Sequence, residues 1–465
     1  MERILIGDAV NYLGKEIKLS GWVNNRRDHG KLIFLEIRDR SGLIQSVIKP
    51  DIENYKSAKE IRPEDVLELE GEIISRPKGM ENPKISTGGI EFKIKRLKVL
   101  APSVTLPFDI YGDGYDIGEE KRMEYRYLDI RRPRLLKNLE KRHKINLFIR
   151  EELAKKGFIE VETPILTKST PEGARDFVVP SRLQPGNFYA LPQSPQQYKQ
   201  LLMVAGIEKY FQIARCFRDE DSRGDRQPEF TQLDIEMSFV EEDDILRLVE
   251  NLLTDAVKNL YPNKKISQGD WPRIDYKEAV KKYNSDRPDL RNDKKNPQEL
   301  SFLWVVNFPG FEWKETEKKW DSAHHPFTKL KIENYKEIKK APSKITAYQY
   351  DLVLNGCEIG GGSLRITNPD DLETMFEFLG HSKTAIKEKF GHLMEAFKYG
   401  VPPHGGIALG LDRLLSVLEN EPSIREVIAF PKTGDSRDLM MDSPSEISKE
   451  QLKELRLKIE KKRKQ

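Results

Sequence analysis

Five short runs in the first hundred residues alternate apolar and polar side chains, and this pattern restricts the fold more than any other feature of the chain. The runs span residues 17–27, 31–40, 42–49, 66–74 and 89–100. A polar stretch with helical character, residues 51–61, separates the third run from the fourth. Three strands, a helix and two strands form the element order of an OB-fold, a small barrel that binds oligonucleotides. We therefore expect a five-stranded barrel within residues 1–103.

Several side chains on or beside the first three runs suit contacts with nucleic acid. They offer positive charge, a ring for stacking and an amide for base edges, and are Arg26, Arg27, His29, Phe34 and Gln45. The alternative is that Phe34 belongs to the barrel core and that the arginines are ordinary residues of basic edge strands. Because the net charge of the chain is only +3, nucleic-acid binding must depend on such local patches.

Length and composition exclude several other classes of protein. A chain of 465 residues is long enough for two or three domains with cores of their own. No stretch approaches the roughly 18 apolar residues of a membrane span, and the first residues lack the layout of a signal peptide. Two cysteines, Cys216 and Cys357, are too few for a disulfide framework or a structural zinc site. We expect a cytoplasmic protein without membrane contact.

The remainder of the chain divides into three parts. Residues 104–132 are expected to form a hinge or linker, residues 133–445 a large domain of helices and strands, and residues 446–465 a basic helical extension. Apolar residues at helical spacing predict a helix over 133–156, which Gly157 ends. The segment FIEVETPIL then begins a strand that runs into Pro164, a residue that cannot donate to a strand ladder.

Residues 216–234, CFRDEDSRGDRQPEFTQLD, combine dense charge of both signs with Phe217 and Phe230 near the two ends. A solvated hairpin on a charged protein would explain this composition. A site for a large polyanion that carries a flat ring would explain it as well, because arginine binds phosphate oxygens and stacks on aromatic rings. The residues of this segment alone do not decide between the two.

The segment YDLVLNGCEIGGGSLR, residues 350–365, predicts a β-hairpin around Asn355–Gly356. Pairing outward from that turn places Asp351 opposite Gly360 and puts Asp351 and Glu358 on one face, roughly 5–8 Å apart. Two carboxylates at that separation favour a cation between them, and magnesium suits such a site. The alternative is a pair of solvent-facing acids, which the neighbouring triple glycine disfavours, because such glycines admit a ligand or another backbone closely.

Residues 400–415, GVPPHGGIALGLDRLL, place glycines before an apolar helix with Arg413 in its first turn or two. A cation there opposes the helix dipole, and an anionic ligand would offset that cost. No GxxxxGK[ST] sequence occurs, so a nucleotide site here would not be a P-loop. The adjacent residues His324 and His325 are expected to point in different directions, and no third ligand has suitable spacing for a metal site.

Together these segments resemble the class II aminoacyl-tRNA synthetases, and within them the aspartyl-tRNA synthetases of bacterial type. FIEVETPIL looks like the first motif of that class, CFRDED with RQPEF like the second, and GIALGLDR like the third. The aspartate branch is indicated by TPEGARDF (170–177), SPQQYKQ (194–200), HHPFT (324–328) and CEIGGGSLR (357–365). The resemblance implies an antiparallel β-sheet flanked by helices in the catalytic domain, and a homodimer that uses ATP, magnesium, L-aspartate and tRNA(Asp).

The resemblance also implies roles for individual residues. Catalysis would depend on Arg218, Glu358 and Arg413. ATP would contact Arg218, Asp219, Glu220, Gln227, Phe230, Glu358, Gly410, Leu411, Asp412 and Arg413. L-Aspartate would contact Glu172, Ser194, Gln196, Lys199, Arg218, Asp234, His324, His325 and Arg365. Magnesium would be held by Asp351 and Glu358, and the tRNA anticodon by Arg26, Arg27, His29, Phe34, Gln45 and Gly79.

The implied reaction needs no nucleophilic side chain. In the family the aspartate carboxylate attacks the α-phosphorus of ATP, and a tRNA hydroxyl then attacks the resulting aspartyl-adenylate, so catalysis is positioning and charge stabilisation. Bacterial-type relatives usually carry an inserted domain between the second and third motifs. Here SDRPDLR (285–291) leads almost directly to LSFLWVVNF, so that domain is missing.

His29 and Gly79 bear on which tRNA is charged. Relatives strict for tRNA(Asp) often carry leucine and lysine at these places, so the resemblance implies a relaxed enzyme that also charges tRNA(Asn). The alternatives are a strictly tRNA(Asp)-specific enzyme, an asparagine- or lysine-activating enzyme, and a catalytically silent paralogue that binds RNA. Silent relatives tend to lose the arginines or the metal acids, and this chain keeps Arg218, Glu358 and Arg413.

Overall fold

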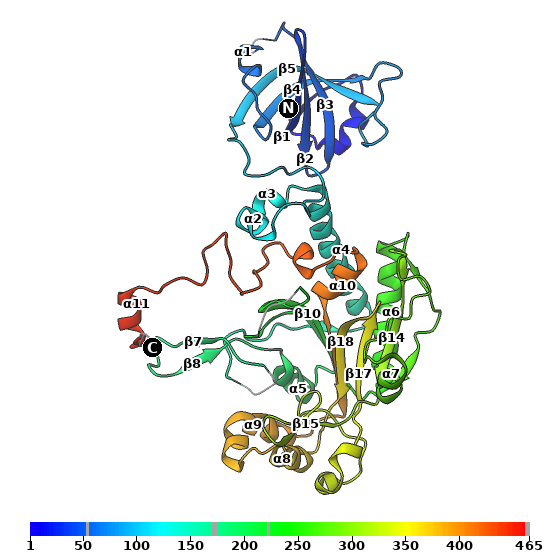
Figure 1. Ribbon diagram of the computed structural model, residues 1–465, viewed down its shortest axis with the longest axis vertical. Coiled ribbons are helices and arrows are strands. Elements are labelled where there is room, and N and C mark those ends of the chain that lie inside the picture. Colours follow the sequence, from blue (N-terminus) through cyan, green and yellow to red (C-terminus); the bar gives the residue numbers. More distant parts are fainter. Residues whose placement is uncertain (53–54, 170–173, 221–223, 461–465) are drawn as a thin grey trace. The chain divides into compact units, whose positions relative to one another are not determined.

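The computed structural model describes residues 1–52, 55–169, 174–220 and 224–460. These residues form two compact units, Met1–Asp109 and Ile110–Gln465 (Figure 1). Each unit has a hydrophobic core of its own. None of the described helices combines the length and the apolarity that crossing a bilayer requires.

The smaller unit is a closed barrel with the strand order β1-β2-β3-β5-β4. Its elements are η1 (Ile6–Tyr12), β1 (Glu16–His29), β2 (Leu32–Asp39), β3 (Gly42–Ile48), α1 (Tyr55–Ala58), β4 (Val66–Ser75) and β5 (Ile90–Ala101). The expected helix at 51–61 is described only as the single turn α1, and residues 53 and 54 lie outside the described residues. The predicted OB-fold is confirmed, because alternate side chains of every strand fill the barrel.

Phe34 lies on the outer face of β2 and not in the barrel core. Its neighbours Ile33 and Leu35 are buried in the core, whereas Phe34 is half-buried and pairs across the ladder with Arg27 of β1. The alternative in which Phe34 is a core residue is therefore wrong. The strand alternation places its ring on the same surface as the Arg27 side chain.

The larger unit is built around an eight-stranded sheet in the order β12-β14-β17-β18-β19-β10-β9-β6. Its strands are β6 (Ile159–Glu160), β9 (Lys209–Phe217), β10 (Glu229–Ser238), β12 (Arg273–Asp275), β14 (Phe302–Val306), β17 (Gln349–Leu354), β18 (Cys357–Leu364) and β19 (His404–Gly410). Neighbouring strands are antiparallel except at the edges, where β6 and β12 run parallel to their neighbours. The predicted antiparallel sheet is thus confirmed, with one parallel strand at each edge.

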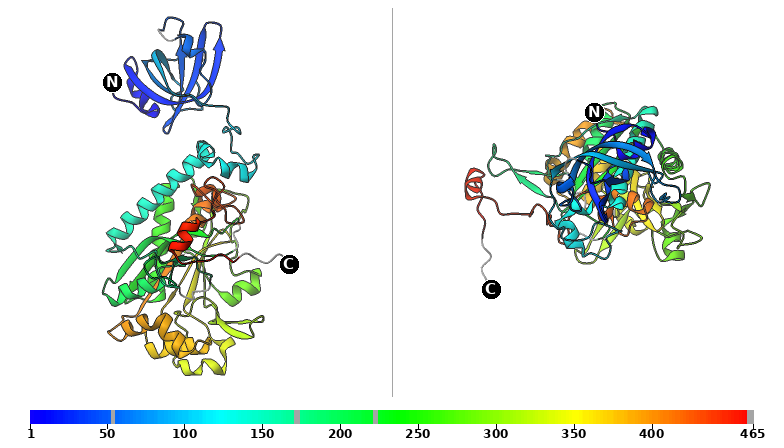
Figure 2. Two further views of the ribbon diagram at one scale, coloured as in Figure 1. Left: turned by 90° about the vertical axis from the view of Figure 1, so that its left-hand side faces the viewer. Right: turned by 90° about the horizontal axis from the view of Figure 1, so that it is seen from above.

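Helices α4 (Pro133–Lys155), α6 (Glu242–Leu260) and α10 (Leu411–Leu418) pack on one face of this sheet (Figure 2). The predicted helix over 133–156 is α4, and Gly157 follows it with a φ of +80°. A capping box of Glu241 and Asp244 begins α6. Apolar residues from the three helices and from the sheet form one core. On the opposite face, a smaller apolar cluster with α7 covers β12, β14 and Val353 of β17, and the buried polar side chains lie on β10 and its neighbours.

Shorter elements complete the larger unit. Its other helices are α2 (Glu119–Glu124), α3 (Arg126–Asp129), α5 (Gln196–Val204), α7 (Tyr276–Tyr283), η2 (Tyr335–Lys340), η3 (Pro342–Lys344), α8 (Pro369–Phe378), α9 (Lys383–Phe397), η4 (Ile424–Val427) and α11 (Lys449–Glu454). The strand pairs β7 (Val178–Pro180) with β8 (Phe188–Ala190), β11 (Lys265–Ile266) with β13 (Glu299–Leu300), and β15 (Phe311–Lys314) with β16 (Lys319–Ser322) form small sheets. Residues 110–132, expected in a linker, carry α2 and α3 and belong to this unit.

Two predicted elements are shorter than expected. The segment FIEVETPIL joins the ladder only over β6, because this edge strand has β9 as its single neighbour. The C-terminal extension is helical only over α11, which ends where Arg456 adopts a φ of 56° in the left-handed region. Residues 461–465, with the basic end of that extension, lie outside the described residues.

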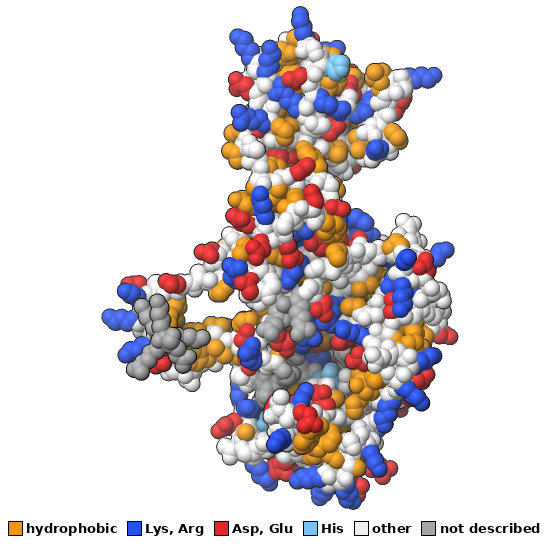
Figure 3. Space-filling model, viewed as in Figure 1, with side chains coloured by type: hydrophobic (Ala, Val, Ile, Leu, Met, Phe, Trp, Pro, Cys, Tyr) orange, Lys and Arg blue, Asp and Glu red, His pale blue; other side chains and the backbone are white. Residues whose placement is uncertain are grey.

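Acidic and basic side chains are interspersed over the visible surface of both units (Figure 3). This distribution agrees with 79 basic and 76 acidic residues in the chain. Because no single sign of charge covers this face, recognition of a polyanion must come from local arrangements of side chains.

The different positions of Phe34 and Phe92 lead to a test of the barrel. Phe92→Ala should lower the free energy of unfolding of a 1–109 fragment by about 3–5 kcal/mol, because Phe92 is fully buried and its removal leaves a cavity. The matched variant Phe34→Ala should cost clearly less. Denaturant unfolding followed by the fluorescence of Trp22, the only tryptophan of residues 1–109, measures both. Equal losses would contradict the described placement.

Candidate active site

The side chains of strand β10 alternate between the two faces of the large sheet, with apolar residues on one face and carboxylates on the other. Leu233 and Ile235 lie in the core beneath the helices, and the intervening Asp234 and Glu236 lie on the opposite face. Both carboxylates are almost completely buried. We call this surface of the sheet, with the side chains that β10, β17, β18 and β19 direct onto it, the site face.

Glycines in the central strands make room for these carboxylates. A Cβ on Gly406 would lie 2.1 Å from Oε2 of Glu236, and a Cβ on Gly361 would lie 2.6 Å from Oδ1 of Asp351. Gly361 belongs to the triple glycine, and a Cβ at the preceding Gly360 would meet the backbone of β19 at 2.1 Å. The expected close approach of another backbone is therefore observed, and any larger residue would displace a carboxylate or a strand.

The Asn355–Gly356 hairpin forms as predicted, with one correction to its register. A bulge brings Asp351 opposite Gly361 and not opposite Gly360, because one extra residue is inserted into β18. Asp351 and Glu358 nevertheless interact, since the Glu358 carboxylate contributes to the raised pKa of Asp351. The conclusion that the two acids share a face is therefore unchanged.

Asp351 and Glu358 form a carboxylate pair, and within the described part of the chain no cation is among the groups that shift the pKa of Asp351. Burial raises the pKa of Asp351 well above its usual range, and the negative charges of Glu358 and Asp286 raise it further. Hard carboxylate oxygens in this state suit a hard divalent cation. No group of three or more His, Cys, Asp or Glu side chains that could hold a metal occurs in the described ranges.

Four buried charges form a closed network on the site face. Lys199 of α5 donates to Asp234 at 2.6 Å and lies 3.1 Å from Glu236. Arg365 binds Glu236 with two parallel hydrogen bonds, of 2.9 and 3.0 Å. Each of the four side chains is at most 3% exposed. Two cations and two anions cancel, which is the condition for burying ionised groups together.

Glu236 was not among the residues singled out from the sequence. Burial alone would disfavour its charge, but Arg365 and Lys199 outweigh burial and lower the pKa of Glu236 to about 2. Burial raises the pKa of Asp234 despite the presence of Lys199. The available signal was a second carboxylate two residues after Asp234, on a strand whose other face is apolar.

The rings of His324 and His325 lie together, which corrects the expectation that they diverge. Their centroids are 4.3 Å apart, and Nδ1 of both rings approaches the hydroxyl of Thr328 at 3.4 and 3.3 Å. Arg365 donates to Nε2 of His325 at 2.6 Å. Burial and nearby cations, first among them Arg365, lower the pKa of His324 to about 3, so the ring is neutral at pH 7.

Arg218 lies at the end of β9 with its guanidinium 5.1 Å from the centroid of the Phe230 ring. Its Nε is buried and has no hydrogen-bond partner within the part of the chain that the structure describes. The positive charge of Arg218 also contributes, after burial, Arg365 and Lys199, to the lowered pKa of His324. A cation stacked on a ring with a free buried donor is an arrangement that suits an anionic ligand.

Arg413 connects the start of α10 with the hairpin. It donates to the carbonyl of Glu358 at 3.0 Å, and its guanidinium lies 3.5 Å from the carboxylate of Asp225. Arg413 is in the first turn of α10, as the sequence predicts. The guanidinium and the Glu358 carboxylate, 3.9 Å apart, thus lie at one edge of the site face.

The neighbours of Arg413 point away from the site. Leu411 is fully buried in the helical core, and Asp412 accepts hydrogen bonds from Arg142 at 2.5 Å and from the backbone of Thr231 at 3.1 Å. Any contact of Leu411 or Asp412 with a nucleotide must therefore come from the backbone. Asp412 instead fixes the start of α10 against α4 and β10.

The Gln227 side chain is hydrogen-bonded to the backbone of Lys432. Its amide donates to the carbonyl of Lys432 at 3.1 Å and accepts from the backbone of the same residue at 2.7 Å. Asp219 and Glu220 follow Arg218 as half-buried residues, and Glu220 lies 3.6 Å from Arg226. These contacts hold the segment after Arg218 in place.

Amides and a third histidine extend the polar surface near Lys199. Gln196 donates to Gln200 at 3.1 Å, and Gln200 lies 3.2 Å from Nε2 of His404. Ser194 accepts from the backbone of Gln196 at 3.3 Å. Glu172, which the resemblance assigns to the aspartate site, lies outside the described residues.

Most of the predicted anticodon residues lie on the neighbouring strands β1, β2 and β3, and Gly79 lies in the loop after β4. Arg26 donates to the carbonyl of Ile61 at 2.7 Å and pairs with Asp28, so its side chain connects β1 with the segment before β4. Arg27 is mostly exposed and lies opposite Phe34. His29, at the end of β1, and Gly79, in the loop after β4, are both exposed. The Gln45 side chain donates a hydrogen bond to Glu91.

Two family models match the chain. The model of tRNA synthetases class II (D, K and N) matches residues 118–434, and that of the OB-fold nucleic acid binding domain matches residues 17–100. The two matches correspond to the large sheet with its helices and to the barrel.

Known relatives match almost the whole chain. An aspartate–tRNA(Asp/Asn) ligase from Syntrophomonas wolfei is 40% identical over 578 residues, which cover 97% of this chain and 98% of the relative. An aspartate–tRNA ligase from Staphylococcus aureus is 40% identical over 575 residues, with coverage of 96% and 97%. The chain therefore belongs to the class II tRNA synthetases and, within them, to the aspartate–tRNA ligases. The resemblance inferred from the motifs and the prediction of an aminoacyl-tRNA ligase are confirmed.

Solved structures share the same fold at low identity. Asparaginyl-tRNA synthetase from Pyrococcus horikoshii, complexed with asparaginyl-adenylate, has a TM-score of 0.75 at 24% identity and covers 93% of this chain and 98% of its own. An aspartyl-tRNA synthetase from Entamoeba histolytica has a TM-score of 0.72 at 20% identity, with coverage of 93% and 91%. The aligned 578 residues of the first relative exceed the 465 residues of this chain, in agreement with a missing insertion.

The raised pKa of Asp351 predicts a stabilising substitution. Because the pKa of Asp351 is raised in the folded protein, ionisation of its carboxyl group destabilises the fold. This cost is absent below the pKa of an aspartate in the unfolded chain, about 3.9. It reaches its full value above the raised pKa of Asp351 in the folded protein. Asp351→Asn should therefore increase the free energy of unfolding at neutral pH, with a gain that shrinks toward about pH 4.

Denaturant unfolding of the full chain in a metal chelator, repeated across that pH range, measures this gain. The exposed Glu315 in the β15–β16 turn provides the control, since Glu315→Gln should change stability little at any pH. A loss of stability in Asp351→Asn at neutral pH would contradict the described electrostatics.

Proposed function

We propose that this protein activates L-aspartate with ATP and transfers it to tRNA(Asp) and tRNA(Asn), with the residues of the site face in defined roles. The observation that carries the proposal is Arg218, whose guanidinium stacks beside Phe230 and keeps a buried Nε without a partner among the described residues. Such a donor suits an α-phosphate oxygen, and the ring beside it suits adenine. Arg413, at the far side of the hairpin, would contact the adenine and the γ-phosphate.

Asp351 and Glu358 would hold a magnesium ion together with phosphate oxygens of ATP. The bound ion would supply charge neutralisation on the phosphates. The pair is suited to this because burial and the negative charges of Glu358 and Asp286 raise the pKa of Asp351. A bound cation would offset these effects. Gly361 is required beside Asp351, since a Cβ there would meet the carboxylate.

Aspartate selectivity would depend on Arg365 and Lys199. Both are buried and fixed by Glu236, so they would meet the substrate carboxylate without further ordering. Asp234 would attract the α-amine. The neutral imidazole of His324 would add a hydrogen-bond donor without adding charge. An aspartate site needs no third positive charge, because Arg365 and Lys199 already supply two.

The reaction then follows from positioning. The α-carboxylate of aspartate would attack the α-phosphorus while Arg218 stabilises the added negative charge, and pyrophosphate would leave toward Arg413. The terminal hydroxyl of tRNA would attack the activated carbonyl in the second step. Neither step requires a nucleophilic side chain, and preorganised cations are the effective catalysts in such a site.

Exposed apolar residues support the homodimer that the resemblance implies. Leu147 of α4, Ile159 of β6 and the following Ile165 and Leu166 are each at least 40% exposed. Apolar side chains gathered near one helix and one edge strand suit burial against a second copy. A cytoplasmic location accords with the two free cysteines and with a substrate that is a tRNA.

Charging of both tRNAs is supported by relatives with that name, including the ligase from Syntrophomonas wolfei. His29 and Gly79 are exposed on the barrel, where an anticodon base would reach them. Imidazole both donates and accepts hydrogen bonds, and a glycine loop adds no charge, so neither residue favours cytosine over uracil. Arg27, Phe34 and Gln45 would supply the remaining contacts.

The role of Arg218 is tested by aspartate-dependent exchange of pyrophosphate into ATP. Arg218→Ala should lower the exchange rate by about 10²–10³-fold, because it removes a donor to the reacting phosphate. Arg215→Ala is the matched control, since Arg215 lies on the same strand, is exposed and pairs with Glu229. It should retain near-normal exchange. Near-normal exchange in a folded Arg218→Ala variant would contradict the assignment.

The anticodon proposal is tested by charging tRNA(Asp) and tRNA(Asn) transcripts with labelled aspartate. The wild type should charge both, and His29→Leu should raise the preference for tRNA(Asp), because leucine removes the adaptable hydrogen bond. Adenylate formation should not change in this variant. If the wild type charges tRNA(Asn) about a thousandfold more poorly than tRNA(Asp), a gap of about 4 kcal/mol, the strict alternative is correct.

A further inference from the structure

The segment that follows α10 binds residues 224–228, which lead into β10 and which we call the return arm. The hydroxyl of Ser423 donates to the carbonyl of Gly224 at 3.0 Å, and the backbone of Ile424 donates to the same oxygen at 3.3 Å. A carbonyl oxygen has two lone pairs, and two donors from one short segment use both of them here. The start of the return arm is therefore fixed by the residues that begin η4.

The next residue of the return arm, Asp225, is a partner of Arg413. Nε of Arg413 donates to the Asp225 carbonyl at 3.3 Å, and the guanidinium lies 3.5 Å from the Asp225 carboxylate. The guanidinium also donates to the carbonyl of Glu358 at 3.0 Å. The orientation of Arg413 thus depends on Asp225, whose preceding peptide carbonyl is held by Ser423.

Glu426 anchors η4 to helices α2 and α4. Arg122 of α2 donates to both of its carboxylate oxygens, at 3.2 and 2.8 Å, and Arg134 of α4 donates at 2.7 Å. Arg122 and Glu426 are only 4% and 5% exposed. Burial by itself would raise the pKa of Glu426, but the hydrogen bonds from the two arginines outweigh it and lower this pKa, so the carboxylate is ionised.

Arg126 of α3 binds the backbone of the same segment. Its guanidinium donates to three carbonyls within residues 425–429, at 2.7, 3.0 and 3.0 Å. The fully buried Asp129 accepts from Arg126 at 2.8 Å and from Arg122 at 3.0 Å. Movement of any member would leave a buried charge without compensation, so this network holds η4 in one position.

We propose that Ser423 and Glu426 are positioning residues for ATP, which orient Arg413 through the return arm without touching the nucleotide. The inference rests on the proposed function, in which Arg413 contacts the adenine and the γ-phosphate. Glu426 fixes η4, Ser423 joins η4 to the return arm, and Asp225 holds the guanidinium. The sequence motifs did not include either residue, because both act on the site through other residues.

Aspartate binding should not depend on this chain of contacts. Lys199 and Arg365, the proposed ligands of the substrate carboxylate, are held by Asp234 and Glu236 of β10. Displacement of the return arm would change the direction of Arg413 and leave these four buried charges in place. A selective effect on ATP therefore distinguishes positioning from a general loss of structure.

The alternative is that Ser423 stabilises only η4. Its hydroxyl also accepts a hydrogen bond from the backbone of Arg425 at 3.2 Å, which is the contact of an N-cap residue. Ser382 makes the same type of contact at the start of α9, where it accepts from the backbone of Ala385 at 3.2 Å. Ser382→Ala is therefore the matched control, because it removes a cap of the same chemistry far along the chain from the return arm.

The test combines calorimetric titration of ATP with magnesium into the full chain and KM values from aspartate-dependent pyrophosphate exchange. Ser423→Ala should weaken ATP binding and raise the KM for ATP by about 3- to 10-fold, the effect of losing one hydrogen bond. The KM for aspartate should change by less than about twofold, since its ligands are fixed elsewhere. Ser382→Ala should keep the wild-type constants for both substrates.

Two further variants examine the intermediate steps. Glu426→Gln should show the same selective loss of ATP affinity, and Ser423→Ala keeps the test valid if Glu426→Gln does not fold. In an Arg413→Ala background, Ser423→Ala should cause no additional loss of ATP affinity, because the group that Ser423 orients is already absent.

Wild-type ATP affinity in Ser423→Ala, or equal losses for ATP and aspartate, overturns the proposal. Losses that simply add in the double variant with Arg413→Ala overturn it as well. If the wild type binds ATP and Ser423→Ala weakens that binding, but no aspartate-dependent exchange occurs, the positioning role is correct and the proposed function is wrong. The titration and the exchange assay thus separate the two conclusions.

Discussion

The paired hydrogen bonds between Arg365 and Glu236 are the interaction on which the site face depends. Both groups are buried, and removing either would leave an uncompensated charge, which is among the most destabilising changes a protein interior can undergo. Lys199 and Asp234 complete the balance, so four charges are tolerated because they sum to zero. The glycine at 406 follows from the same arrangement, since Glu236 occupies the volume that a side chain there would need.

This network also sets the protonation of its surroundings. The positive charges of Arg365 and Lys199 add to burial in lowering the pKa of His324, so the histidines stay neutral. The same cations keep Glu236 ionised despite its burial. On the other side of Gly361, burial and the charges of Glu358 and Asp286 raise the pKa of Asp351, and no described cation offsets them. One sheet therefore offers a balanced region for a zwitterionic amino acid beside an unbalanced carboxylate pair that suits a cation.

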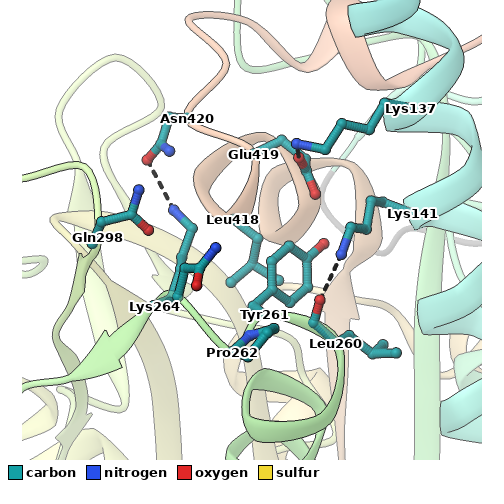
Figure 4. A pocket seen from close by; sticks show the side chains of 11 residues that line it. Lys137, Lys141, Leu260, Tyr261, Pro262, Lys264, Gln298, Leu418, Glu419 and Asn420 are labelled. Carbon is teal, nitrogen blue, oxygen red and sulfur yellow. Dashed lines mark hydrogen bonds and ion pairs between the residues drawn. The ribbon is translucent and has the colours of Figure 1, made fainter. Parts of the chain in front are cut away.

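Helix α10 joins the site face to the helical layer. Its start carries Arg413 toward the hairpin, while Asp412 is held by Arg142 of α4 and by the backbone of β10. Its end, at Leu418, lines a pocket together with residues of α4 and of the end of α6 (Figure 4). The Arg413 side chain is held by the carbonyls of Asp225 and Glu358, whereas Asp412 fixes the start of the helix on the opposite side.

The sequence by itself determined those helices, strands and turns that depend on residues close together in the chain. The barrel strands, the helix α4 and the Asn355–Gly356 turn follow from period-two alternation, helical spacing and turn chemistry, and the structure contains each of them. The motifs around Arg218, Glu358 and Arg413 identified the family for the same reason, because each motif is a contiguous run of residues.

Only the tertiary structure decided the features that depend on residues far apart in the chain. The bulge that sets Asp351 opposite Gly361 lies in β18, which pairs with both β17 and β19, and the turn sequence did not predict it. The partnership of Glu236 with Arg365 joins residues 129 positions apart, and His325, whose ring lies beside that of His324, contacts the same distant Arg365. Buried charges choose partners by proximity in space, because the cost of desolvation is met only by an opposite charge in contact.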